Sequence, residues 1–274
     1  MTKEYRYSNA VSLLGAVRVI FVGLISSVIG GGAYAYALAY IPFVYVRLLL
    51  TIGWSLGLGW LVANQGMKGN VRSPLLLATV AVMCALVALY FEYAVYVVAL
   101  VKDGLDWTDF LPETVLARNT ALLEQGSWSY GQTGEPVRGD DLKPIWIIEA
   151  IIIILFSGVG AHMFAAEKVF CEHCKRWYEG RLGEQYLSTG DDSALWDDVR
   201  NGDLSKLTQL EQFDGPEFPC LRVDVYRCPS CQDSNYYSLV KLYGRHKKEY
   251  IVKMVWIAEQ DLPFVLNEQS SGED

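Results

Sequence analysis

The chain has 274 residues, of which 52% are hydrophobic and only 20% charged, and its net charge at pH 7 is −8. Soluble globular proteins carry about 25% charged residues. Most of the apolar excess lies in the first 166 residues. This composition excludes an ordinary soluble enzyme and a disordered chain.

Four apolar runs follow one another in this part of the chain, at about residues 18–38, 44–63, 75–101 and 145–165. Each is long enough to cross a lipid bilayer as a helix, which takes roughly 20 residues. We therefore predict a transmembrane domain of four helices over residues 1–166, surrounded by a lipid bilayer, with a first span that is not cleaved.

The basic residues predict the orientation of these spans. Lys and Arg lie before the first run, between the second and third, and after the fourth, whereas residues 102–143 carry four basic and eight acidic residues. Short loops rich in Lys and Arg stay in the cytoplasm. The pattern predicts a protein of the cell (inner or plasma) membrane with both termini in the cytoplasm and an outer loop over residues 103–144. In that loop we expect a short helix capped by Asp109, with Pro112 in its first turn and Gly126 at its end.

Ionisable residues inside the predicted spans are costly, and three of them are candidates for a site. Helical rise places Arg47, Glu92 and Glu149 at similar depth, near the outer face. One interpretation is a proton or cation site. The other, which we favour, is an Arg–Glu lock between helices or side chains that reach the interface.

Small residues at helical spacing indicate close helix packing. Gly53 and Gly57 form a GxxxG pattern in the second span, and Ser157, Gly158 and Gly160 lie in the fourth. The contact they predict is either within one chain or between copies in a homo-oligomer.

The strongest chemical signal lies beyond the spans, in residues 167–265. Cys171 and Cys174 form one CxxC motif, and Cys228 and Cys231 form a second. Each CxxC turn directs two thiolates at one point, and two such turns complete a tetrahedral site with four sulfur ligands. In a reducing compartment, four cysteines so paired indicate a metal rather than disulfides.

The segments that follow each motif resemble the zinc-ribbon group, in which a hairpin follows each CxxC turn. We expect one hairpin from residues 176–178 and 184–187 and another from residues 236–242 and 248–255, with β-forming residues around glycines. The resemblance implies one structural zinc on the four cysteines. Two short helical patterns, at residues 193–200 and 203–213, are inserted between the motifs, and residues 266–274 form an acidic flexible tail. Cys220 is either a buried thiol or a substitute ligand.

The predicted fold is thus a membrane α-helical domain of four transmembrane helices with a small β-rich cytoplasmic zinc-ribbon domain that carries an inserted helical segment. Residues 166–274 contain 13 Lys and Arg against 20 Asp and Glu, a net charge of −7, which argues against a nucleic-acid partner. No nucleophilic, HExxH or phosphate-loop motif is present, so we expect no enzyme.

The leading functional hypothesis is a membrane anchor for a structural zinc domain that docks a membrane or cytoplasmic protein or holds a membrane complex together. One alternative is a rubredoxin-like electron carrier with iron in place of zinc, because Cys228-Pro229-Ser230-Cys231 is similar to a rubredoxin knuckle. A second alternative is an oligomeric transporter or channel, with Arg47, Glu92 and Glu149 along its path and the zinc ribbon as a regulatory tail.

Overall fold

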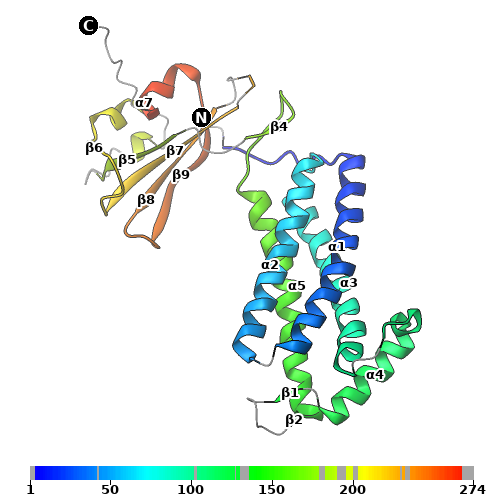
Figure 1. Ribbon diagram of the computed structural model, residues 1–274. Helices are drawn as coiled ribbons and strands as arrows, with labels where there is room; N and C mark the ends of the chain where they lie inside the picture. The colour runs from blue at the N-terminus through cyan, green and yellow to red at the C-terminus, as the bar shows by residue number, and fades with distance from the viewer. Residues whose placement is uncertain are drawn as a thin grey trace. The chain divides into compact units, whose positions relative to one another are not determined.

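The computed structural model describes residues 4–41, 43–101, 104–126, 128–129, 136–178, 183–189, 196–199, 203–228, 230–231 and 235–266. They form two compact units. One comprises Ser8–Glu167, and the other combines the residues up to Tyr7 with the chain from Lys168 onward. The first unit is mainly helical, and the second is built on a β-sheet (Figure 1).

Four long helices make up the helical unit: α1 (Leu13–Tyr40), α2 (Val44–Lys68), α3 (Pro74–Val101) and α5 (Leu142–Ala166). They cover the four predicted spans, and each is long and apolar enough to cross a membrane. Helix α1 begins well before residue 18 because the Ser12 hydroxyl accepts a hydrogen bond from the Gly15 amide at 3.3 Å and caps the helix there.

The four long helices form one bundle, in which α1 packs against α3, α2 against α5, and α3 against α5 (Figure 1). Its buried core consists largely of small and aliphatic side chains, among them Ala35, Val62, Ala81 and Ile153. Glycines allow the closest backbone contacts: a Cβ on Gly31 of α1 would lie 2.5 Å from the Ala88 carbonyl oxygen of α3.

The segment between α3 and α5 contains the 3₁₀ helix η1 (Trp107–Phe110), helix α4 (Pro112–Gln125) and the 3₁₀ turn η2 (Gly139–Asp141). It also contains a short antiparallel pair of strands, β1 (Trp128–Ser129) and β2 (Pro136–Val137). Helix α4 matches the helix predicted for the outer loop, including its Pro at the first position and its Gly after the last.

Asp109 has a different role from the one predicted. The residue that caps α4 is Leu111, and the Asp109 side chain is only 3% exposed. Its carboxylate accepts a hydrogen bond from the Asp106 amide at 2.8 Å and forms an ion pair with Arg118 at 2.8 Å. Asp109 therefore joins η1 to α4 instead of beginning the helix.

The second unit is built on a five-stranded antiparallel sheet with the strand order β6-β5-β7-β8-β9. Its strands are β5 (Gly183–Ser188), β6 (Gln212–Phe213), β7 (Cys220–Arg227), β8 (Asn235–Leu242) and β9 (Lys248–Ile257). Strands β8 and β9 form the second hairpin that the sequence predicts. A separate two-stranded hairpin consists of β3 (Phe170–Cys171) and β4 (Arg176–Trp177).

The first predicted hairpin is wrong in its pairing. Strand β4 pairs with β3 across the first CxxC turn, whereas β5 pairs with β7 and β6 in the larger sheet. The physical reason is burial: Leu187 of β5 is only 2% exposed and contacts the apolar side chains of β7 and β8. That burial stabilises β5 more than a short hairpin with β4 would.

The insert between β5 and β7 packs against the sheet where the structure describes it. Residues 196–199 are helical, and the 3₁₀ helix η3 (Ser205–Gln209) follows. Val199 and Leu207 are buried in the same apolar core as β7 and β8. The second predicted helix is therefore shorter than residues 203–213, because the chain enters β6 after η3.

The described chain ends with the 3₁₀ turn η4 (Glu259–Asp261) and helix α7 (Leu262–Leu266), whose Leu262 and Val265 belong to the sheet core. The predicted acidic tail lies outside the described residues from residue 267 onward.

The N-terminal residues belong to the sheet unit. Glu4 forms an isolated antiparallel bridge with Val255 of β9, and the Tyr5 amide donates a hydrogen bond to the Met254 carbonyl at 2.8 Å. Residues that precede the first helix thus pack with residues that follow the last long one.

Candidate metal centre

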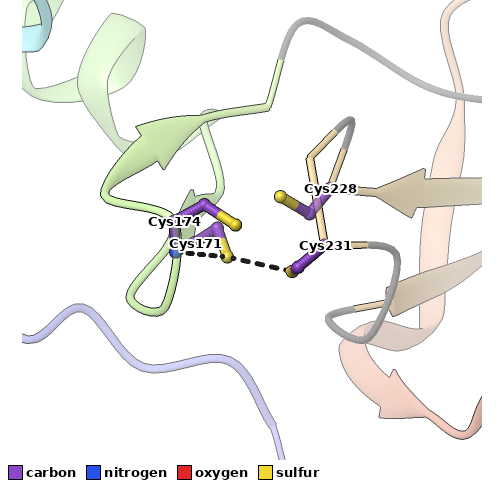
Figure 2. Close-up of side chains that lie close together, drawn as sticks. All are labelled: Cys171, Cys174, Cys228 and Cys231. Atoms are coloured by element: carbon purple, nitrogen blue, oxygen red, sulfur yellow. Dashed lines mark hydrogen bonds between the residues drawn. The ribbon is translucent and has the colours of Figure 1, made fainter.

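The four predicted cysteine ligands come from two turns that the fold brings together. Cys171 ends β3 and Cys174 lies in the β3–β4 turn, while Cys228 and Cys231 lie in the connection between β7 and β8. Figure 2 shows the two pairs facing each other, with their sulfur atoms directed toward a common point.

The positions of the sulfur atoms suit a tetrahedral metal ion. All four Sγ atoms lie within 4.8 Å of one another, and those of Cys171 and Cys231 are 3.7 Å apart. Four sulfurs placed about 2.3 Å from a central zinc are separated from each other by about 3.8 Å. The four cysteines can therefore bind a metal ion with little movement, and a set of four thiolates suits zinc or iron.

The local environment of the cysteines affects their protonation, and metal binding has to release these protons. Cys171 and Cys228 are buried, and the Cys174 amide donates a hydrogen bond to Cys171 Sγ at 3.4 Å. Removal from water, together with the hydrogen bonds to the neighbouring thiols, raises the pKa of Cys174 to about 12. A cation among the four sulfurs reverses this effect, because its charge stabilises thiolates.

A shell of aromatic side chains surrounds the cysteines, and the sequence did not single out its members. Tyr5, Tyr178 and Tyr236 pack together with the four cysteines, and the Tyr5 ring meets the Tyr236 ring edge to face at 5.3 Å. The Tyr5 hydroxyl accepts a hydrogen bond from the Phe170 amide at 3.0 Å. No sequence pattern predicts this contact, since 165 positions separate the two residues.

Lys175 follows the first pair of cysteines with a positive φ of +53°. This left-handed conformation suits glycine best, because a Cβ there crowds the backbone. The turn thus has a glycine-like conformation although the residue is a lysine.

Cys220 and His173 lie outside the sulfur cluster. Cys220 begins β7 and is fully buried against Val240 and Leu242, and this burial raises the pKa of its thiol. It is separated from Cys228 by the length of the strand, roughly 26 Å. His173 lies exposed in the β3–β4 turn. Of the two alternatives for Cys220, the buried thiol is correct.

The three ionisable residues predicted at similar depth, Arg47, Glu92 and Glu149, line one cavity. Glu149 accepts a hydrogen bond from the Tyr34 hydroxyl at 2.6 Å, and Glu92 is only 3% exposed. Arg47 donates from Nε to the Ile41 carbonyl at 2.7 Å and from Nη2 to the Leu38 carbonyl at 2.6 Å. Its guanidinium thus binds main-chain oxygens at the end of α1.

Gly53 and Gly57 do not provide the close helix contact within this chain. Apart from the chain neighbours and the adjacent backbone of α2 itself, no atom of the described residues lies within 4 Å of a Cβ placed on either glycine. The close contact between α2 and α5 occurs instead at Gly59, where a Cβ would lie 2.5 Å from the Ser157 carbonyl oxygen. Contact between copies through Gly53 and Gly57 stays a prediction.

Comparisons with protein-family models, with curated proteins and with solved structures found no match to this chain. The function is therefore argued from the geometry of the site.

Proposed function

We propose that this chain anchors a structural zinc module in the membrane, and that the module docks a protein partner or holds a membrane complex together without catalysing a reaction. The observation that carries this proposal is the cluster of four cysteine sulfurs, all within 4.8 Å of one another. Four thiolates fill the coordination sphere of zinc and leave no position for a substrate, as is usual in structural sites.

The position of the site in the fold supports a structural role. The β3–β4 hairpin supplies two ligands and the β7–β8 connection supplies the other two, so a bound metal joins the small hairpin to the main sheet. The aromatic shell of Tyr5, Tyr178 and Tyr236 adds apolar contacts around the cysteines. The CxxC turns and the β8–β9 hairpin also resemble those of zinc ribbons.

The chain topology supports a cytoplasmic location for the module. Residues 4–7 and the chain from Lys168 onward belong to one compact unit, so both lie on the same side of any membrane that the four helices cross. The basic segments next to the spans favour the cytoplasmic side of the cell membrane. The reducing environment there keeps the thiols available for metal.

The partner is inferred from charge. Residues 166–274 carry 13 Lys and Arg against 20 Asp and Glu, and a net charge of −7 does not suit a phosphate backbone. We therefore propose a protein partner, either another membrane protein, a cytoplasmic protein or a second copy of this chain.

The first test is the metal content of the detergent-purified full chain, measured together with its absorption spectrum. We expect about one zinc per chain and no visible colour. Iron with visible absorption would replace this function with that of a membrane-bound electron carrier. A sample prepared without chelators that contained neither metal would contradict both.

A second test substitutes the ligands one at a time. Cys174→Ala and Cys228→Ala should each abolish stoichiometric zinc and lower the amount of chain that accumulates in membranes, because loss of a structural zinc site unfolds small domains. Cys220→Ala is the matched control: it removes a buried thiol from the same sheet and should keep the zinc. A Cys174→Ala variant that kept its zinc and a folded sheet unit would contradict the proposal.

A further inference from the structure

The helical unit contains a cavity with a volume of about 210 Å³. It lies between the C-terminal parts of α1 and α3 and the N-terminal parts of α2 and α5, and its walls are mainly aliphatic and aromatic side chains, including Tyr93, Tyr96 and Trp146. Glu92 and Glu149 add two carboxylates to this apolar lining. Such a site favours a ligand that is apolar and charged at once.

The two carboxylates differ in their hydrogen-bond partners. Glu149 is held by the Tyr34 hydroxyl, which also lies 2.6 Å from Thr51 Oγ1. Among the described residues, no hydrogen bond or ion pair joins the Glu92 carboxylate to another group, although Glu92 is 97% buried (3% exposed). Because a buried carboxylate normally pairs with a cation or a donor, Glu92 marks the place where a ligand group is missing.

The charges that face the cavity leave it negative when both acids are ionised. Among the described lining residues, Arg47 alone carries a guanidinium or ammonium group, against the two carboxylates. Part of its charge is neutralised by the α1 carbonyls that it binds, since the end of a helix carries about half a negative charge. A single positive charge on the ligand would offset most of the negative charge that remains.

We propose that this cavity binds an amphipathic monocation, an ammonium group on an apolar body that enters from the lipid. The lining residues Leu48 and Ile148 are 45% and 57% exposed, so the cavity reaches the outer surface of the bundle between α2 and α5. In a membrane, this surface faces lipid chains. The aromatic walls suit the same ligand, because ring faces attract ammonium groups.

The test is equilibrium binding of radiolabelled benzyltrimethylammonium to the full chain in a non-ionic detergent. The wild-type protein should bind one molecule per chain in a saturable manner. Glu92→Gln keeps the shape of the side chain but removes its charge, and it should weaken binding about tenfold to a hundredfold, the range for a charge-assisted contact. Glu113→Gln on the exposed side of α4 is the matched control and should bind like the wild type.

A neutral ligand of the same shape distinguishes the effect of charge on binding from the effect of shape. Neopentylbenzene replaces the ammonium nitrogen by carbon, and its binding should not distinguish the wild type from Glu92→Gln. A second variant, Leu48→Trp, fills the lipid-facing mouth without changing charge and should also weaken binding of the cation. A single peak in size-exclusion chromatography verifies that each variant is folded.

Two results would overturn the proposal: no saturable binding to the wild type, or equal affinity of the wild type and a folded Glu92→Gln variant. A competition experiment with lipids identifies the source of the ammonium group. Displacement of the probe by phosphatidylethanolamine but not by phosphatidylglycerol assigns the site to a lipid headgroup, and no displacement by either assigns it to a free amphipathic amine.

Discussion

Lys175 adopts a backbone conformation that costs free energy for any residue with a Cβ. Its φ of +53° lies in the left-handed region, which costs residues other than glycine roughly 1–2 kcal/mol. We predict that Lys175→Gly stabilises the metal-bound sheet unit by about 0.5–1 kcal/mol, because relief of this strain exceeds the added freedom of the unfolded chain. The measurement is the temperature of thermal unfolding of the zinc-loaded protein.

Arg176→Gly is the neighbouring control for that prediction. Arg176 lies in strand β4, where glycine weakens the strand, so this variant should unfold at a lower temperature than the wild type. Shifts of the same sign for both variants would show that strain at Lys175 is not the cause.

Tyr5 connects the N-terminal residues to the cysteine cluster, and its pKa leads to a prediction about pH. Its hydroxyl accepts the hydrogen bond from the Phe170 amide, so Tyr5→Phe should destabilise the sheet unit by about 1 kcal/mol. Burial, partly offset by this hydrogen bond, raises the pKa of Tyr5 from 10 to about 12. The pKa of Tyr5 is higher in the folded protein than in the unfolded chain. The stability that the Tyr5 hydroxyl contributes is therefore present below pH 10 and is lost as the pH rises toward 12.

The denaturant concentration that releases the zinc, measured at pH 8 and at pH 11, checks this prediction. The difference between the wild type and Tyr5→Phe should be larger at pH 8. Tyr250→Phe, at a half-exposed ring on β9, should change neither value. A difference between the wild type and Tyr5→Phe that grew with pH would contradict the assigned role of the hydroxyl.

At the scale of single residues, the clustering of the four cysteines was easier to predict than their surroundings. Cys171, Cys174, Cys228 and Cys231 were predictable because CxxC spacing reflects local geometry. Tyr5 was not, because its contact with the metal centre depends on how distant segments pack. The same holds for Glu92 and Glu149: their depth followed from helical rise, but the cavity between them depends on which helices are neighbours.

At the scale of helices, we predict opposite effects on stability for alanine substitutions at two glycines of α2. Gly59→Ala places a methyl group 2.5 Å from the Ser157 carbonyl oxygen, so it should force α2 and α5 apart and cost about 1–3 kcal/mol. Gly53→Ala meets no atom of the described residues and should stabilise the helix by up to about 1 kcal/mol.

Thermal unfolding in detergent, compared between these two variants, measures the difference. Destabilisation by Gly53→Ala at protein concentrations where the wild type forms oligomers, but not where it is monomeric, would place Gly53 between copies of the chain. Equal behaviour of the two variants at every concentration would contradict the assignment of Gly59 to the close contact.

The helices were predictable from the sequence because long apolar runs leave little choice of structure. The pairing of the strands was harder to predict from the sequence. The β8–β9 hairpin follows from local pattern, while the pairing of β5 with β7 depends on burial of Leu187 in a core that other segments complete. Hairpins between neighbours in sequence are local features, and sheet order is not.

At the scale of the whole molecule, the fold separates two kinds of chemistry along the chain. The bundle contains carboxylates in an apolar setting, and the sheet unit contains four thiols arranged for metal. The proposed ammonium site and the proposed zinc site can therefore be tested independently, since variants of Glu92 should keep the zinc and variants of Cys174 leave the lining of the cavity unchanged.

The bridge between Glu4 and Val255 has a consequence for biosynthesis. A ribosome produces Glu4 and Tyr5 before any helix of the bundle, and it produces β9 only after all four long helices. Glu4 and Tyr5 must therefore remain without their β9 partners while the bundle is synthesised, and they reach their place beside β9 only near the end of translation. If synthesis stops inside the bundle, Tyr5 lacks the side chains that it packs against in the complete protein. An incomplete chain therefore lacks its C-terminal residues and also has an N-terminal segment that is not packed.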